Sequence, residues 1–161
     1  MRQTRTRYDR RMSDPTVRLD DLLMRAARAL RRGWAQALEP LSLTPHQARA
    51  LRVIGELGAP RLGTVAERLH IAPRSATEVV DALADRDLVE RVADEGDRRA
   101  ICVRLTGSGA TVLAEVEAAQ TAVAARHFAQ LDDRDRADLT RVLLKLDSGA
   151  GLAPLRAGAE R

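Results

Sequence analysis

Aromatic residues are scarce in this chain, at 2% of 161 residues, with a single Trp, a single Tyr and a single Phe. A hydrophobic core must therefore come mainly from Leu, Val and Ala, which favours helices. Hydrophobic residues still amount to 45% and charged residues to 31%. This balance is typical of a soluble globular protein with one domain, or with one domain and appendages.

Cysteine and long apolar runs are also nearly absent. Cys102 is the only cysteine, so no intramolecular disulfide can form and nothing points to an oxidising compartment. No apolar run approaches the roughly 20 residues that span a bilayer. The arginine-rich N-terminus is not followed by the apolar segment of a secretory signal. We therefore expect a cytoplasmic protein with no membrane contact.

Lysine is as rare as cysteine, because Lys145 is the only one. Nearly all of the 27 basic residues are therefore arginines, against 23 acidic residues and a net charge of +4. Arginine suits bidentate contacts with phosphate and guanine. A GC-rich genome produces the same excess of Arg and Ala, so charge alone does not indicate nucleic-acid binding.

Patterns for catalysis or metal binding are missing. His46, His70 and His127 lack the spacing of metal ligands. Ser108 stands between glycines without the strand, sharp turn and helix that a nucleophilic serine needs. No pair of acids and no phosphate-binding loop occurs. We expect no enzyme, no cofactor and no metal site.

The most informative part of the chain is Arg61 to Thr106. Apolar residues there recur at helical spacing twice, and Pro73 opens the second of these helices. Two short apolar strands follow, Leu88–Val92 and Ala100–Leu105. The two helical faces consist of Leu62, Val65, Ala66 and Leu69, then Ala76, Val79, Val80 and Leu83. Helix, turn, helix and hairpin is the order of a winged helix-turn-helix, which binds double-stranded DNA through two elements.

The second helix of this motif carries the candidate recognition residues. Because its apolar residues face inward, the outer surface holds Arg74, Ser75, Thr77, Glu78 and Asp81. The first turn of a recognition helix reaches base edges, where Arg74 can bond guanine or phosphate. The alternative for Ser75 and Thr77 is an ordinary first-turn role, satisfying backbone N–H groups.

The hairpin provides the second candidate contact. Ile101, Val103 and Leu105 alternate with Ala100, Cys102 and Arg104, the period of a half-buried strand, so Cys102 is expected to be a small half-buried residue. The tip carries Asp97, Arg98 and Arg99. A guanidinium on a narrow β-loop can enter the minor groove, and Asp97 is near enough to hold Arg99. The alternative is a solvated charged turn.

Helices are predicted on both sides of the motif. The first begins at Asp14-Pro15 and is stopped by Pro40, and a second begins at Thr44-Pro45 and ends at Gly58. After a break at residues 107–109, further helices run from 110 to about 130 and from about 133 to 149. The outermost helices have apolar faces that a winged unit does not need. A partner chain is the natural place to bury them.

These patterns divide the chain. We expect residues 1–13 to form a disordered basic arm, which either adds phosphate contacts or is a solvated leader. We expect residues 14–41 and 107–148 to form a dimerisation region, 42–106 the DNA-binding domain, and 149–161 a flexible tail. The predicted fold class is mainly α with a small β-hairpin.

Several stretches resemble the multiple-antibiotic-resistance-regulator (MarR) family of dimeric winged-helix transcription factors. The stretches are Leu43–Gln47, Ala72–Thr77, Leu88–Arg91, Asp97–Arg99 and Val103–Thr106. The resemblance spans roughly Pro15 to Asp147. It implies a homodimer joined through the terminal helices, a recognition helix in the major groove, and the Asp-x-Arg of the wing at Asp97 and Arg99.

The resemblance also implies a regulatory mode. Many members are repressors that a small phenolic or lipophilic compound releases from DNA by entering a cleft. The candidate cleft residues are Trp34, which otherwise packs in the core, and His46, which otherwise only caps or packs. Peroxide-sensing members use a cysteine in the first long helix, which this chain lacks. The alternatives are an effector-independent activator or regulator, and a dimeric interaction module without DNA binding.

Overall fold

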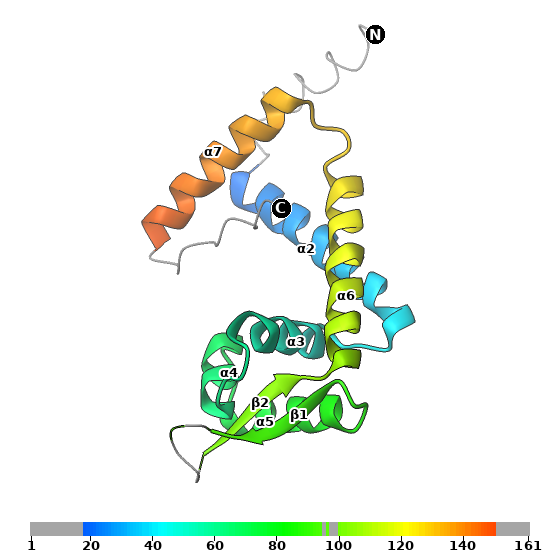
Figure 1. Cartoon of the computed structure of the whole chain (residues 1–161). Coiled ribbons are helices and arrows are strands. Elements are labelled where there is room, and N and C mark those ends of the chain that lie inside the picture. Colours follow the sequence, from blue (N-terminus) through cyan, green and yellow to red (C-terminus); the bar gives the residue numbers. More distant parts are fainter. Residues whose placement is uncertain (1–17, 95, 97–99, 151–161) are drawn as a thin grey trace, which may run out of the picture. The chain divides into compact units, whose positions relative to one another are not determined.

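The computed structural model describes residues 18–94, 96 and 100–150, which form helices and one two-stranded sheet (Figure 1). The chain divides into two compact units, residues 1–124 and 125–161. In chain order the elements are α2 (Leu19–Leu38), the 3-10 turn η1 (Glu39–Leu41), α3 (Pro45–Leu57), α4 (Leu62–Leu69), α5 (Pro73–Ala84), β1 (Val89–Ala93), β2 (Ile101–Leu105), α6 (Gly107–His127) and α7 (Asp133–Ala150). None of the described helices is long and apolar enough to cross a membrane.

The core lies among α3, α4, α5 and the hairpin, and it is aliphatic as expected from the scarcity of aromatics. Its completely buried large side chains include Leu51, Ile54, Leu69, Leu83 and Val103. The predicted inner face of α5 is confirmed at Ala76, Val80 and Leu83, while Val79 is only partly buried.

The start of α3 is fixed by a capping box. The Thr44 hydroxyl accepts from the Gln47 backbone N–H, and the Gln47 side chain accepts from the Thr44 N–H at 2.8 Å. Such a box satisfies two backbone donors that a helix leaves free. The predicted ends of α3 are confirmed, since Pro45 is its first residue and Gly58 its C-cap.

Strands β1 and β2 pair antiparallel, with Val89 opposite Leu105 and Ala93 opposite Ile101. On its other side β2 forms an isolated bridge between Cys102 and Arg61, just before α4. The Val103 N–H donates to the Pro60 carbonyl at 2.9 Å. β2 therefore has a neighbour on both sides, which the sequence did not reveal.

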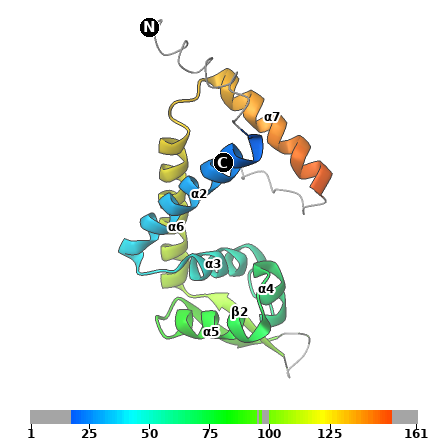
Figure 2. The ribbon, with the colours of Figure 1, turned by 180° about the vertical axis from the view of Figure 1, so that it is seen from behind.

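Within the first unit, α6 passes close to α2 and α3, and Figure 2 shows the crossing from behind. A Cβ added at Gly33 would lie 2.8 Å from Val123, and one at Gly55 would lie 2.6 Å from Leu113. Glycine at these two positions permits helix backbones to approach closely.

Two predicted helix boundaries differ from the structure. Arg18 is extended and α2 begins at Leu19, where Asp20 and Asp21 suit the positive end of the helix dipole. The helix ends at Leu38, just before Pro40, as predicted. Gly107 and Gly109 do not break the chain. They lie in the first turn of α6, because Thr106 caps that helix by accepting from the Gly109 N–H at 2.9 Å.

The last helix was predicted to run to about residue 149, and the described part of α7 runs to Ala150. Asp132 caps the start of this helix, because its carboxylate accepts from the Asp135 N–H at 2.8 Å. Residues 1–17, which include the basic arm and Asp14-Pro15, lie outside the described residues, as do residues 151–161 of the tail.

The predicted strand alternation fails at Ile101, which is 52% exposed, while Cys102 and Val103 are both buried. The reason is position along the hairpin. Ile101 pairs with exposed Ala93 at the outermost rung of the ladder, whereas Cys102 lies beside Arg61 and its thiol donates to Asp94.

Two helices present apolar side chains to the outside of the single chain. These are Leu19, Leu22, Leu23 and Met24 on α2, and Leu139, Val142, Leu143, Leu144 and Leu146 on α7. Exposed apolar patches of this kind mark interaction surfaces.

Candidate nucleic-acid interface and effector cavity

The first turn of α5 presents its charged side chains outward. The Arg74 side chain is 92% exposed, and its Nε lies 3.3 Å from Glu78 Oε1, one helical turn away. A pair this exposed contributes little to stability, so it leaves the guanidinium available for other partners. Arg74 and Glu78 thus lie where a recognition helix would contact base edges.

Ser75 and Thr77 are less available than predicted, since both are half-buried. The Thr77 hydroxyl donates to the Pro73 carbonyl at 3.1 Å, within its own helix. Asp81, also predicted to face outward, is half-buried and pairs with Arg91 of β1 at 2.5 Å. This pair ties α5 to the hairpin.

The base of the wing is organised around Asp94. One carboxylate oxygen, Oδ2, accepts from Arg61 Nε at 2.8 Å and from the Cys102 thiol at 3.3 Å. The other, Oδ1, accepts from the Gly96 N–H at 2.9 Å. The predicted tip residues Asp97, Arg98 and Arg99 lie outside the described residues, so their DNA contacts stay a prediction.

This arrangement shifts two pKa values in opposite directions. The Arg61 guanidinium, with help from the Gly96 N–H and the Cys102 thiol, holds the pKa of the Asp94 carboxyl well below its usual range. Burial, reinforced by the Asp94 carboxylate, raises the pKa of the Cys102 thiol. A buried thiol with a raised pKa is a poor nucleophile, which agrees with a structural role for Cys102.

Trp34 and His46 line one cavity, of about 420 Å³, within the first unit. Its lining residues are Arg31, Trp34, Ala35, Leu38, Pro45, His46, Arg49, Arg52 and Gln120. They come from α2, α3 and α6. The volume falls in the range of small-molecule sites, which are mostly apolar with a few convergent polar groups.

The chemistry of this cavity is cationic and apolar. Three guanidinium groups and one imidazole are among its lining, and the described residues that line it include no carboxylate. Arg52 also hydrogen-bonds Gln120, which joins α3 to α6. The Trp34 indole N–H is buried and has no hydrogen-bond partner among the described residues.

A second, more open cavity of about 420 Å³ lies between the start of α3 and α5. Thr44, Gln47, Ser75 and Val79 are among its lining residues. His46 lines this cavity as well as the first one.

The sequence missed most of the cationic lining. Arg49 and Arg52 follow His46 at intervals of three, which places them near one face of α3, so that signal was present. Gln120 lies on α6 and no local pattern could have assigned it. Among the described residues, no group of three or more His, Cys, Asp or Glu could hold a metal ion.

Helix, turn, helix and a two-stranded wing, with an exposed arginine at the head of the second helix, define a winged helix-turn-helix protein. Residues 43–101 match the MarR family. An uncharacterized HTH-type transcriptional regulator of Mycobacterium bovis is 32% identical over 114 residues, which cover 71% of this chain and 77% of that protein. The chain belongs to the MarR family of winged helix-turn-helix transcription regulators, which bind DNA and are not enzymes.

Solved structures agree with this assignment. The apo form of wild-type MarR from E. coli shares the fold at a TM-score of 0.74 and 22% identity, covering 83% of this chain and 98% of that one. The MarR family protein Rv2887 of Mycobacterium tuberculosis, solved in complex with salicylic acid, is 28% identical with a TM-score of 0.65, covering 82% and 98%.

Proposed function

We propose that this regulator is a homodimeric repressor that binds a pseudo-palindromic operator and that an aromatic or lipophilic acid releases. The observation that supports an effector is the cavity of about 420 Å³. Its apolar lining includes Trp34, Leu38 and Pro45, and its basic lining includes Arg31, Arg49 and Arg52. The apolar residues suit an aromatic ring, and the guanidinium groups suit a carboxylate. The salicylic acid complex of Rv2887 supports this class of ligand.

The exposed apolar faces of α2 and α7 support the homodimer. Side chains such as Leu22 and Leu143, roughly half exposed in the single chain, would be buried against a second copy. Two recognition helices related by two-fold symmetry would then read two half-sites, which makes the operator palindromic. Light scattering should show a dimer of the full chain at micromolar concentration, and a monomer would contradict the proposal.

DNA retention tests the operator. Genomic fragments that the purified protein retains at physiological salt should share an inverted repeat whose half-sites lie about 10 base pairs, or a multiple of that, apart. Fragments without a shared repeat would contradict sequence-specific binding by a symmetric dimer.

Salicylate titration tests the effector. Trp34 is the only tryptophan, so its fluorescence reports binding directly. We expect salicylate to quench Trp34 and to release the operator fragment. Salicyl alcohol, which keeps the ring and lacks the carboxylate, is the matched control and should bind at least about tenfold more weakly. If a panel of aromatic acids and lipophilic compounds neither quenches Trp34 nor releases DNA, the effector-independent alternative is favoured.

A further inference from the structure

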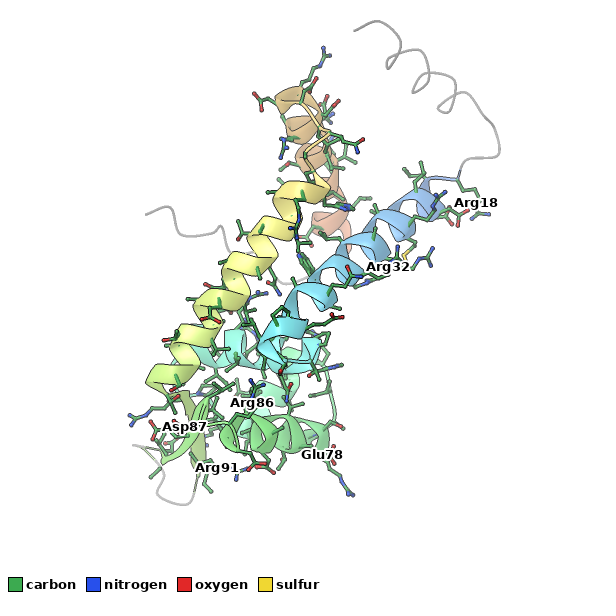
Figure 3. All side chains as sticks on the ribbon, turned by 90° about the vertical axis from the view of Figure 1, so that its right-hand side faces the viewer. Arg18, Arg32, Glu78, Arg86, Asp87 and Arg91 are labelled. Atoms are coloured by element: carbon green, nitrogen blue, oxygen red, sulfur yellow. The ribbon has the colours of Figure 1, made fainter. Side chains whose placement is uncertain are left out.

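Arg86 lies immediately beyond the end of α5 and reaches across to the segment that joins α2 to α3. Its Nη1 donates to the Ser42 carbonyl at 2.8 Å, and its Nη2 donates to the Leu41 carbonyl at 2.9 Å. Figure 3 shows Arg86 between α5 and this connecting segment. One guanidinium thus donates to two successive carbonyls. These two hydrogen bonds fix the orientation of the guanidinium relative to the connecting segment as well as its distance from it.

The connecting segment, residues 39–44, lies between two walls of the cationic cavity. Leu38 of α2 precedes it and Pro45 of α3 follows it, and both line that cavity. Ser42 has a left-handed backbone with φ of 51°, and the Leu43 N–H donates to the Leu38 carbonyl at 3.3 Å. The segment is therefore a tight turn, and a change in the spacing of α2 and α3 has to displace it.

The other end of the contact is equally well fixed. The Arg86 N–H donates to the Leu83 carbonyl at 3.3 Å, and the Leu88 N–H donates to the same carbonyl at 3.0 Å. Leu83 and Leu88 are both buried in the core. The backbone of Arg86 therefore moves with α5, the helix that also carries Arg74.

The facing sides of α3 and α5 are not closely packed everywhere. The second cavity, lined by Thr44 and Gln47 on one side and by Ser75 and Val79 on the other, separates them near their N-terminal halves. An open space thus lies between the first turn of α3 and α5, whereas beyond the end of α5 Arg86 is hydrogen-bonded to the connecting segment.

We propose that Arg86 is a positioning residue that transmits occupancy of the cationic cavity to the recognition helix. A ligand that spreads α2 from α3 shifts the Leu41 and Ser42 carbonyls, and Arg86 carries that shift to the end of α5. The inference rests on the proposed function, because it assigns the route by which that effector acts. Coupling between two sites requires a structural element whose position depends on the state of both sites. Arg86 is that element, because it contacts the connecting segment beside the cavity and moves with α5.

The test compares Arg86→Gln, Arg86→Lys and Arg68→Gln in the full chain. Glutamine removes the charge and the double hydrogen bond, and lysine keeps the charge without the planar fork. Arg68 is the matched control, because it is also a surface arginine and pairs with Glu56 of α3, away from the connecting segment.

Two quantities are measured for each protein. One is the ratio of operator Kd values with and without saturating salicylate. The other is the salicylate Kd without DNA, from Trp34 fluorescence. We expect a wild-type ratio of about tenfold or more, which Arg86→Gln reduces below about twofold and Arg86→Lys reduces partly. Salicylate Kd without DNA stays within about twofold in all variants, and Arg68→Gln keeps the wild-type ratio.

Two results would overturn the inference. One is an Arg86→Gln protein whose ratio of operator Kd values equals that of wild type. The other is a loss of salicylate affinity without DNA that matches the loss in this ratio, because Arg86 would then only shape the cavity. If Arg86→Gln does not fold, the same two criteria are applied to Arg86→Lys. A wild-type protein that binds operator but shows no response to salicylate contradicts the proposed effector instead.

Discussion

Replacing Gly109 by alanine should destabilise the protein severely. A Cβ at this position would lie 1.8 Å from the Leu88 carbonyl oxygen and 2.8 Å from the Leu88 carbonyl carbon. Both are backbone atoms next to β1, so no side-chain rotation relieves the clash. The first turn of α6 must move away from Leu88 by roughly 1 Å or more to restore ordinary contact.

That movement breaks the hydrogen bonds around Thr106. Its N–H donates to Leu88 at 3.2 Å, its hydroxyl donates to Asp87 at 2.6 Å, and it accepts from Gly109 at 2.9 Å. Two or three lost hydrogen bonds cost about 1 kcal/mol each. With about 1–3 kcal/mol for overpacking, the total is about 3–6 kcal/mol.

Thermal unfolding followed by circular dichroism measures this effect. At about 2–4 °C per kcal/mol for a chain of this size, Tm should fall by roughly 6–24 °C. Protein concentration must be held constant, because self-association shifts Tm. Gly63→Ala is the matched control, since its Cβ meets nothing within 4 Å inside α4, and it should gain about 0.5–1 kcal/mol. A Gly109→Ala protein that melts within about 2 °C of wild type would refute the reasoning.

Three further predictions concern the DNA-binding unit. Arg74→Ala should cost about 1–3 kcal/mol of operator affinity per half-site and relax preference at one base pair, whereas Arg99→Ala should weaken specific and unspecific binding alike and reduce the salt slope by roughly one per half-site. Titrations across a salt series measure both, and undiminished binding by both variants would mean that DNA contacts another surface. Cys102 should react with iodoacetamide much more slowly in the folded protein than in denaturant at neutral pH, because its thiol is buried and its pKa is raised; equal rates would contradict this. Because the pKa of Asp94 is lowered on folding, its ionised form stabilises the protein at neutral pH, and that contribution is lost as pH falls below about 4. The stability difference between wild type and Asp94→Asn should therefore shrink in acid, and a difference independent of pH would exclude the carboxylate as its source.

Much of the fold follows from local patterns. The helical spacing in Leu62–Leu69 and the proline at the head of Pro73–Ala84 predicted α4 and α5 correctly. The glycines at residues 107 and 109 led to a wrong prediction of a chain break, because glycine has a low intrinsic helix propensity. The tertiary contact with the Leu88 carbonyl, which no local pattern contains, makes glycine necessary there.

Some residues of the candidate site could also be predicted from local patterns, and others could not. The exposed position of Arg74 follows from the inward face of its own helix. Trp34 and His46 both line one cavity, and their role in effector binding stays a prediction. Arg61 and Arg86 gave no sequence signal. Each acts on partners more than thirty residues away, and only the folded chain brings those partners within hydrogen-bond distance.

The hairpin's neighbours also govern how the protein behaves at high concentration. A sheet edge with free N–H and C=O groups invites other chains to add strands and aggregate. β2 presents no such free edge along Cys102 and Val103, because Arg61 and Pro60 lie beside it. The outer edge of β1 is five residues long and carries Glu90 and Arg91, each held in an ion pair. Short, charged edges resist strand addition. The described strands of the wing are therefore poor templates for aggregation.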